Sequence, residues 1–181
     1  MLRLLDLENQ HCSLKLVYTL SDALKNDPER IKLAQELTLD ESRPHMGLKG
    51  RHGLFGSDEW WNSIYSKKMK LKFVSGVISR TYYSGMDSDR RNNAYELTLA
   101  DGSLHQEGFY YNDTKDKYLY EIGKKVLIVY AQDELKKDNG RGKYSETPIE
   151  IAISYDIVPL ETKPANKLLQ RIKKSFAFFT R

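Results

Sequence analysis

The residues of this chain best suited to hold a metal ion are its four histidines, and their spacing argues against a metal site. Zinc motifs pair histidines about three to five residues apart, whereas the chain has only His11, His45, His52 and His105. Residues 87–92 (DSDRRN) begin like a calcium loop, but they place Arg91 at a ligand position and lack the central glycine. We therefore expect no metal and no cofactor.

Residues that do nucleophilic or acid–base chemistry also lack a supporting pattern. Ser57 is without the flanking glycines of a nucleophile elbow, and Tyr144 stands where a phosphate-binding loop needs Ser or Thr. Asp133 and Glu134 are adjacent, so on a strand they would point to opposite faces. The single cysteine, Cys12, fits a reducing compartment and an inert thiol. The sequence therefore predicts no catalytic residues, and an enzyme with an unrecognised site is our third alternative.

Aromatic residues offer a second kind of chemistry, the binding of flat or apolar groups. Adjacent residues on a strand point to opposite faces, so we expect some of these rings to be exposed beside a cation. The candidate binding residues are the cation Arg80 and the aromatic residues Trp60, Trp61, Tyr82, Tyr83, Tyr110 and Tyr111. Such rings stack bases in barrels that bind single-stranded nucleic acid, but those barrels also need a cationic groove. Residues 67–155 hold fifteen cations and thirteen acids, so nucleic-acid binding is only the second alternative. The simpler interpretation is that the tryptophans anchor their helix on the core and that the tyrosines lie on a half-buried sheet surface.

The excess of positive over negative charge in the chain is confined to its last nineteen residues. Residues 163–181 contain six cations and no acid, whereas residues 1–162 contain 23 Lys and Arg against 25 Asp and Glu. The body is therefore not basic, although the whole chain has a net charge of +4. A nucleic-acid-binding domain would need clustered cations on its own surface.

The basic tail, residues 159–181, has the spacing of an amphipathic helix. Phe176 and Phe179 fall on its apolar stripe, and Lys167, Arg171 and Lys174 lie on or near the opposite side. Three positions for this helix remain open: packed on its own body, docked on a protein partner or a second copy, or resting weakly on an anionic membrane.

Several elements must position these residues. Residues 13–39 are predicted to be helical in two pieces, the second starting at Asp27-Pro28-Glu29, and residues 40–56 form a glycine-rich connector. Ser57 caps a short helix that carries the two tryptophans. Alternating residues then predict five antiparallel strands between residues 70 and 158, with a tight hairpin at Asp101-Gly102.

Together these elements predict a single α+β protein built around a small five-stranded antiparallel β-barrel, OB-like or SH3-like, because closure removes exposed strand edges. We expect a helical segment with its connector over 1–56, the short helix and barrel over 57–158, and the amphipathic tail helix over 159–181. The acids near the N-terminus argue against a signal peptide, which favours the cytoplasm. The best interpretation is a non-catalytic cytoplasmic binding or adaptor module that contacts a protein partner, a second copy or an anionic surface through its tail and exposed aromatics.

Overall fold

The computed structural model describes residues 3–85, 91–138, 140 and 142–159. Their strands form one antiparallel sheet, with three α-helices and one short 3-10 helix around it. In chain order the elements are β1 (Leu14–Thr19), α1 (Leu20–Asn26), α2 (Pro28–Leu39), α3 (Asp58–Tyr65), β2 (Lys70–Tyr82), β3 (Ala94–Leu99), β4 (Leu104–Gly108), η1 (Thr114–Leu119), β5 (Lys124–Glu134) and β6 (Tyr144–Ile157).

The sheet is open and has six strands, so the predicted five-stranded barrel, OB-like or SH3-like, is wrong. The strand order is β1-β6-β5-β2-β3-β4, and among the described residues the two outer strands, β1 and β4, do not pair with each other. The barrel was predicted because exposed edges are a liability. The sheet stays open, and several of its edges are instead protected locally by a short strand, a proline and capping side chains.

The sixth strand comes from the segment that was expected to be helical. The segment is mostly apolar, with Leu14, Leu16, Val17 and Tyr18, and β1 pairs antiparallel with β6 from Leu14↔Ser154 to Thr19↔Glu150. Helical structure begins only at Leu20, where the Thr19 hydroxyl accepts the backbone N–H of Asp22 as an N-cap. The pattern of residues 14–20 fits both the helical period and the two-residue period of a strand, and pairing with β6 selects the strand.

Other local predictions are confirmed. The Asp27 side chain caps α2, with Pro28 in the first turn, and the Ser57 hydroxyl caps α3. The hairpin at Asp101-Gly102 joins β3 to β4. The five strands predicted between residues 70 and 158 are present as β2–β6. These signals depend on neighbours in sequence, which is why they could be identified without the fold.

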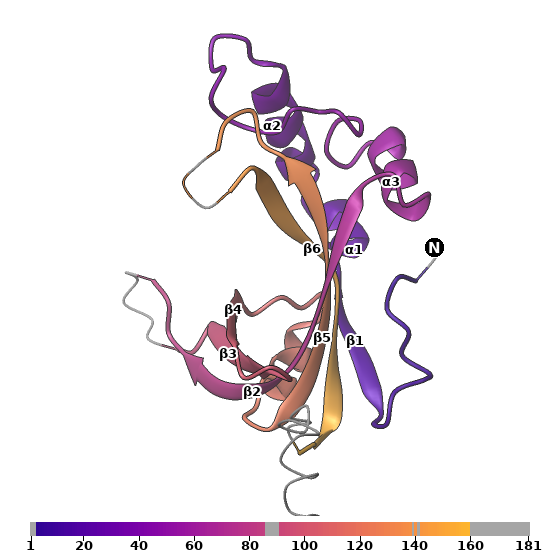
Figure 1. The fold of residues 1–181 in the computed structure, drawn as a ribbon, viewed down its shortest axis with the longest axis vertical. Coiled ribbons are helices and arrows are strands. Elements are labelled where there is room, and N and C mark those ends of the chain that lie inside the picture. The colour runs from indigo at the N-terminus through magenta and orange to yellow at the C-terminus, as the bar shows by residue number, and fades with distance from the viewer. Residues whose placement is uncertain (1–2, 86–90, 139, 141, 160–181) are drawn as a thin grey trace, which may run out of the picture.

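The sheet is strongly curled towards one of its faces. β2 and β3 separate β4 from β5 in the sheet, yet the His105 side chain of β4 reaches the Tyr130 hydroxyl of β5 at 2.8 Å. Figure 1 shows the same curl: β3 and β4 bend away at one end of the long strands, and the ends of β5 and β6 lean out at the other. We call the side bearing Tyr130 the concave face.

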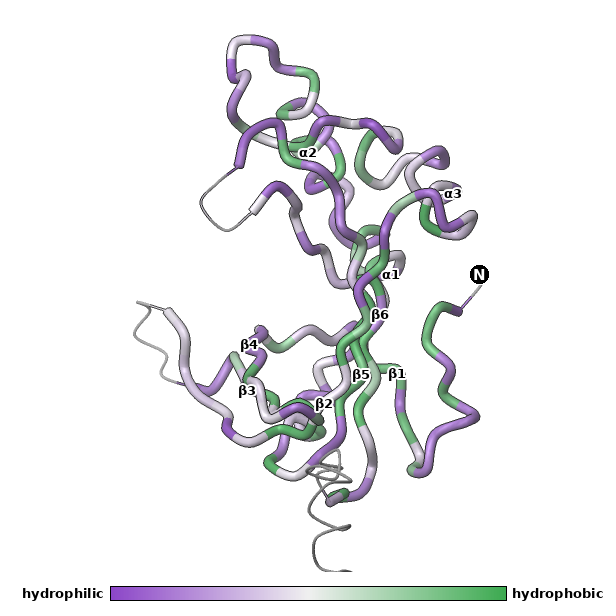
Figure 2. The backbone as a smooth tube through the Cα atoms, in the orientation of Figure 1, coloured by the Kyte–Doolittle hydropathy of each residue, from purple (hydrophilic) through white to green (hydrophobic). Residues whose placement is uncertain are grey.

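The hydrophobic core follows the middle of β5 and β6 on both sides of the sheet. Val126 to Ala131 and Ile151 to Ile153 are all buried, and Figure 2 shows apolar segments where β1, β5 and β6 run together, with polar segments at the two ends. α3 contributes Trp60 and Ile64, which are fully buried. This rigid centre is what holds the concave face in place.

The predicted tail helix falls on residues 160–181, which lie outside the described residues. Within the described part of the chain, no helix has the length and apolar character of a membrane span.

Candidate protein-binding face

Tyr130 of β5 is the centre of the concave face. Its side chain is 1% exposed, and its hydroxyl donates to Glu107 Oε2 at 2.6 Å while lying 2.8 Å from His105 Nε2. His105 and Glu107 are two residues apart on β4, so they share one face of that strand. A tyrosine hydroxyl has a single proton, and here Glu107 accepts it. The His105 Nε2 therefore carries the proton it donates to the tyrosine oxygen.

Tyr130 and His105 in this group are both neutral near neutral pH. Burial, with the neighbouring Glu107 carboxylate, raises the pKa of Tyr130 far above its usual value, so the phenol stays neutral. Burial also lowers the pKa of His105 and outweighs the opposing effect of Glu107. The neutral imidazole and the neutral phenol therefore present hydrogen-bond donors and acceptors and carry no charge.

A second polar cluster adjoins the tyrosine ring. Lys72 pairs with Tyr130 in the β2–β5 register, and its ammonium lies 5.7 Å from the ring centroid and 2.7 Å from Glu146 Oε2. Gln132 donates to Glu146 Oε1 at 2.8 Å. Burial raises the pKa of Glu146, but the hydrogen bonds from Lys72 and Gln132 prevail and lower it overall. Glu146 is therefore ionised and held in one orientation.

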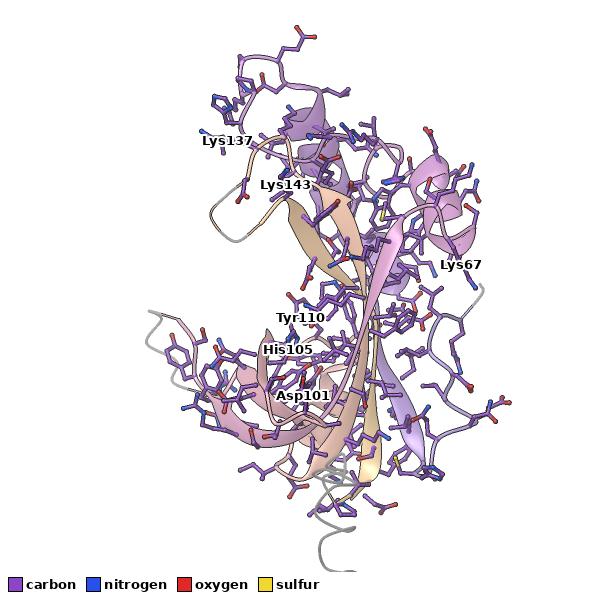
Figure 3. All side chains as sticks on the ribbon, in the orientation of Figure 1. Lys67, Asp101, His105, Tyr110, Lys137 and Lys143 are labelled. Atoms are coloured by element: carbon purple, nitrogen blue, oxygen red, sulfur yellow. The ribbon has the colours of Figure 1, made fainter. Side chains whose placement is uncertain are left out.

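This second cluster forms the floor of an open pocket of about 540 Å³. The pocket is lined by residues of β2, β5, the connection that follows β5, and the start of β6: Lys72, Gln132, Gly142, Lys143, Tyr144, Ser145 and Glu146. Tyr144 is 51% exposed. Figure 3 shows Lys143 at the upper side of the concave face and His105 across from it. The face thus combines positioned polar groups with an exposed aromatic ring.

The predicted aromatic residues of α3 do not join this face. Trp60 is fully buried, and its Nε1–H donates to Asp133 Oδ2 at 2.9 Å. Trp61 is half-buried, stands edge-on to Trp60 at 4.9 Å and stacks on Tyr65. This placement agrees with the interpretation of the tryptophans as the anchor of α3.

The remaining predicted aromatics lie in two further places. The Arg80 guanidinium lies 4.8 Å above the Tyr82 ring and 3.3 Å from Glu96, and the half-buried Tyr83 follows β2. Tyr110 and Tyr111 follow β4 and pack against the core, with the Tyr110 ring 5.2 Å from Tyr18. Burial raises the pKa of Tyr110. The predicted residues therefore form separate groups rather than one platform.

The predicted tail residues fall outside the described part of the chain: Lys167, Arg171, Lys174, Phe176 and Phe179. Sequence reasoning missed the two polar clusters of the concave face: Lys72, His105, Glu107, Tyr130, Gln132 and Glu146. The only local signal was polar residues two apart, His105 with Glu107 and Tyr130 with Gln132. Their convergence depends on the curl of the sheet.

The chemistry available to this face is hydrogen bonding and ion pairing with another molecule. Across the described residues, no three His, Cys, Asp or Glu side chains gather as metal ligands. The positioned groups are nevertheless varied: a neutral phenol, an imidazole, an amide, two carboxylates and one lysine ammonium. Rigid polar groups beside an exposed aromatic ring are typical of surfaces that bind proteins.

Comparison with known families assigns the class. The family described as immunity protein RhsI2 matches residues 14–154, well over half of the chain. The chain therefore belongs to the RhsI2 family of immunity proteins. A comparison with curated proteins finds no match. Membership of an immunity family supports the predicted protein-binding module in its general form, while nucleic-acid and membrane contacts stay predictions.

Proposed function

We propose that this protein neutralises an Rhs toxin by binding the toxin domain through its concave face, and that it does so in the cytoplasm. The observation that carries the proposal is the match of residues 14–154 to an immunity family. This range starts at the first residue of β1 and contains every residue of the two polar clusters. It ends before the basic tail, which supports the sheet rather than the tail as the contact surface.

The geometry of the face supports this role. Association is costly when long side chains must be ordered on binding, and hydrogen bonds already fix Lys72, Gln132 and Glu146 in the free protein. Their charges and donors are therefore presented without much further ordering. The exposed Tyr144 beside them is one of the residue types enriched among the hot spots of protein interfaces.

Two tyrosines at opposite ends of β6 allow a matched test. Tyr144 lines the pocket and is 51% exposed, whereas Tyr155 is 47% exposed at the far end of the strand. We expect Tyr144→Ala to weaken binding of the toxin domain by about tenfold or more, as for an interface anchor. Isothermal titration calorimetry with the purified toxin domain measures this effect.

Tyr155→Ala is the control, with the same loss of ring and similar exposure. It should bind within about threefold of the wild type, because surface residues outside an interface contribute little. The same pair should differ in protecting cells that express the toxin. Equal binding by both variants would remove the concave face from the proposal, and failure of the wild type to bind or protect would overturn the proposal itself.

A further inference from the structure

The first half of β2 is an open sheet edge. β5 pairs with Lys70–Val77 on one side, but β3 covers the other side only from Gly76 onward. Ile78 O accepts the N–H of Gly123 at 2.8 Å on the β5 side. Backbone groups alternate sides along a strand, and the register is unbroken here. The N–H and C=O groups of Leu71, Phe73 and Ser75 therefore point to the open edge.

Other edges of the sheet are protected. Along β1, Asn112 N–H donates to Val17 O at 2.9 Å, and its side-chain oxygen accepts Thr19 N–H at 2.6 Å. The uncovered half of β6 contains Pro148, which has no N–H to offer. β4 is only five residues long. Short strands, prolines and capping groups are common ways to block unwanted pairing, so the open part of β2 stands out among the described strands.

Positive charge gathers at the N-terminal end of this edge. Lys67, Lys68 and Lys70 are exposed, and none forms an ion pair with another described residue. Lys67 lies at the end of α3 (Figure 3). Lys70 pairs with Gln132 in the register and so lies on the side of the concave face. On the opposite side, Phe73 is 60% exposed.

We propose that an acidic, extended segment of the partner adds to the sheet as a further strand along Leu71–Ser75. This inference rests on the proposed function, because the partner is the Rhs toxin domain. Cross-strand neighbours share a face, so the segment should present Asp or Glu beside Lys70 and an apolar side chain beside Phe73. A second copy is a poorer occupant, since it would bring the same lysines to the same edge.

Residue-resolved amide exchange tests the added strand directly. In the free protein, the amides of Leu71, Phe73 and Ser75 should exchange quickly, while those of Lys72 and Val74, which face β5, are protected. Binding of the toxin domain should slow exchange at the three outward amides by about tenfold or more, as expected for a newly formed hydrogen bond. Unchanged exchange in the complex would overturn the inference.

Two variants give an independent measurement. Ser75→Pro removes an outward N–H without breaking the β5 pairing, and Ser75→Ala is its control. The double variant Lys68→Glu/Lys70→Glu reverses the local charge, and Lys115→Glu, an exposed lysine of η1, is its control. Circular dichroism and thermal melts establish that each variant folds.

We expect Ser75→Pro and the double lysine variant each to weaken toxin-domain binding by about tenfold, with both controls close to the wild type. If the wild type binds and both test variants bind equally well, strand addition is wrong while the proposed function stands. If the wild type does not bind at all, the proposed function fails first. Concentration-dependent protection of the three amides without toxin would assign the edge to a second copy and overturn the inference.

Discussion

Two carboxyl side chains on neighbouring positions of the β5 strand, one buried and one partly exposed, illustrate how environment sets the behaviour of single residues. Asp133 is 1% exposed, and one of its carboxylate oxygens has no hydrogen-bond partner among the described residues. Burial raises the pKa of Asp133, although the hydrogen bond from Trp60 works against this shift. Beside it, the hydrogen bond from Lys49 lowers the pKa of Glu134. The two carboxyls should therefore respond to pH in opposite ways.

We predict that the Asp133→Asn variant becomes more stable relative to the wild type as the pH rises. A carboxyl whose pKa is raised on folding loses stability as the pH rises from the unfolded-state pKa through the folded-state pKa. The amide stays neutral and still accepts the Trp60 N–H, so the variant should gain free energy of unfolding relative to the wild type between about pH 4 and pH 7. Urea unfolding across this range measures the difference.

Glu134→Gln is the matched control. The lowered pKa of Glu134 stabilises the fold above the unfolded-state value, and this stability is lost as pH falls through the folded-state pKa. Its substitution should therefore be most costly near neutral pH. An Asp133→Asn difference that does not change with pH would show that folding does not raise the pKa of Asp133.

At the scale of elements, the glycine-rich connector fixes the position of α3. Gly53 has a φ of +91°, and a Cβ at this residue would lie 2.8 Å from the backbone nitrogen of Trp60. Gly102 in the β3–β4 hairpin has a similar φ of +83°, but a Cβ there meets nothing within 4 Å. Alanine substitutions at these two glycines therefore separate the free-energy cost of a left-handed backbone from the cost of a steric contact with α3.

We predict that Gly102→Ala lowers the free energy of unfolding by about 1–2 kcal/mol, the cost of a left-handed conformation with a side chain. Gly53→Ala should cost about 2–5 kcal/mol, because overpacking adds about 1–3 kcal/mol. Denaturant unfolding measures both. Equal losses would mean that α3 shifts freely and is not held by the close approach.

Elements set by neighbours in sequence were predictable, and those set by distant pairing were not. The caps of α2 and α3 and the hairpin at Asp101-Gly102 follow from a few adjacent residues. The strand at Leu14–Thr19 depends on β6, more than 130 residues away. The polar clusters depend further on the curl that brings His105 to Tyr130. No pattern in a single strand encodes that approach.

On the scale of the whole molecule, the family match and the charge distribution point to different parts of the chain. The match covers the sheet, residues 14–154, whereas residues 160–181 contain six cations and one acid, Glu161. Removing these residues changes the net charge from +4 to −1. A distant charge of this size mainly affects how fast partners meet, while contacts at the interface set how long they stay together.

We therefore predict that a chain ending at Pro159 still folds and still binds the Rhs toxin domain. Its dissociation rate should stay within about threefold of that of the full chain. At low salt its association rate should be lower than that of the full chain, and the two association rates should become equal at high salt. Surface plasmon resonance at several salt concentrations separates the two rates. A tenfold faster dissociation would place the basic tail in the interface and would favour the contact first expected from the sequence, in which Phe176, Phe179 and the tail cations touch the partner directly.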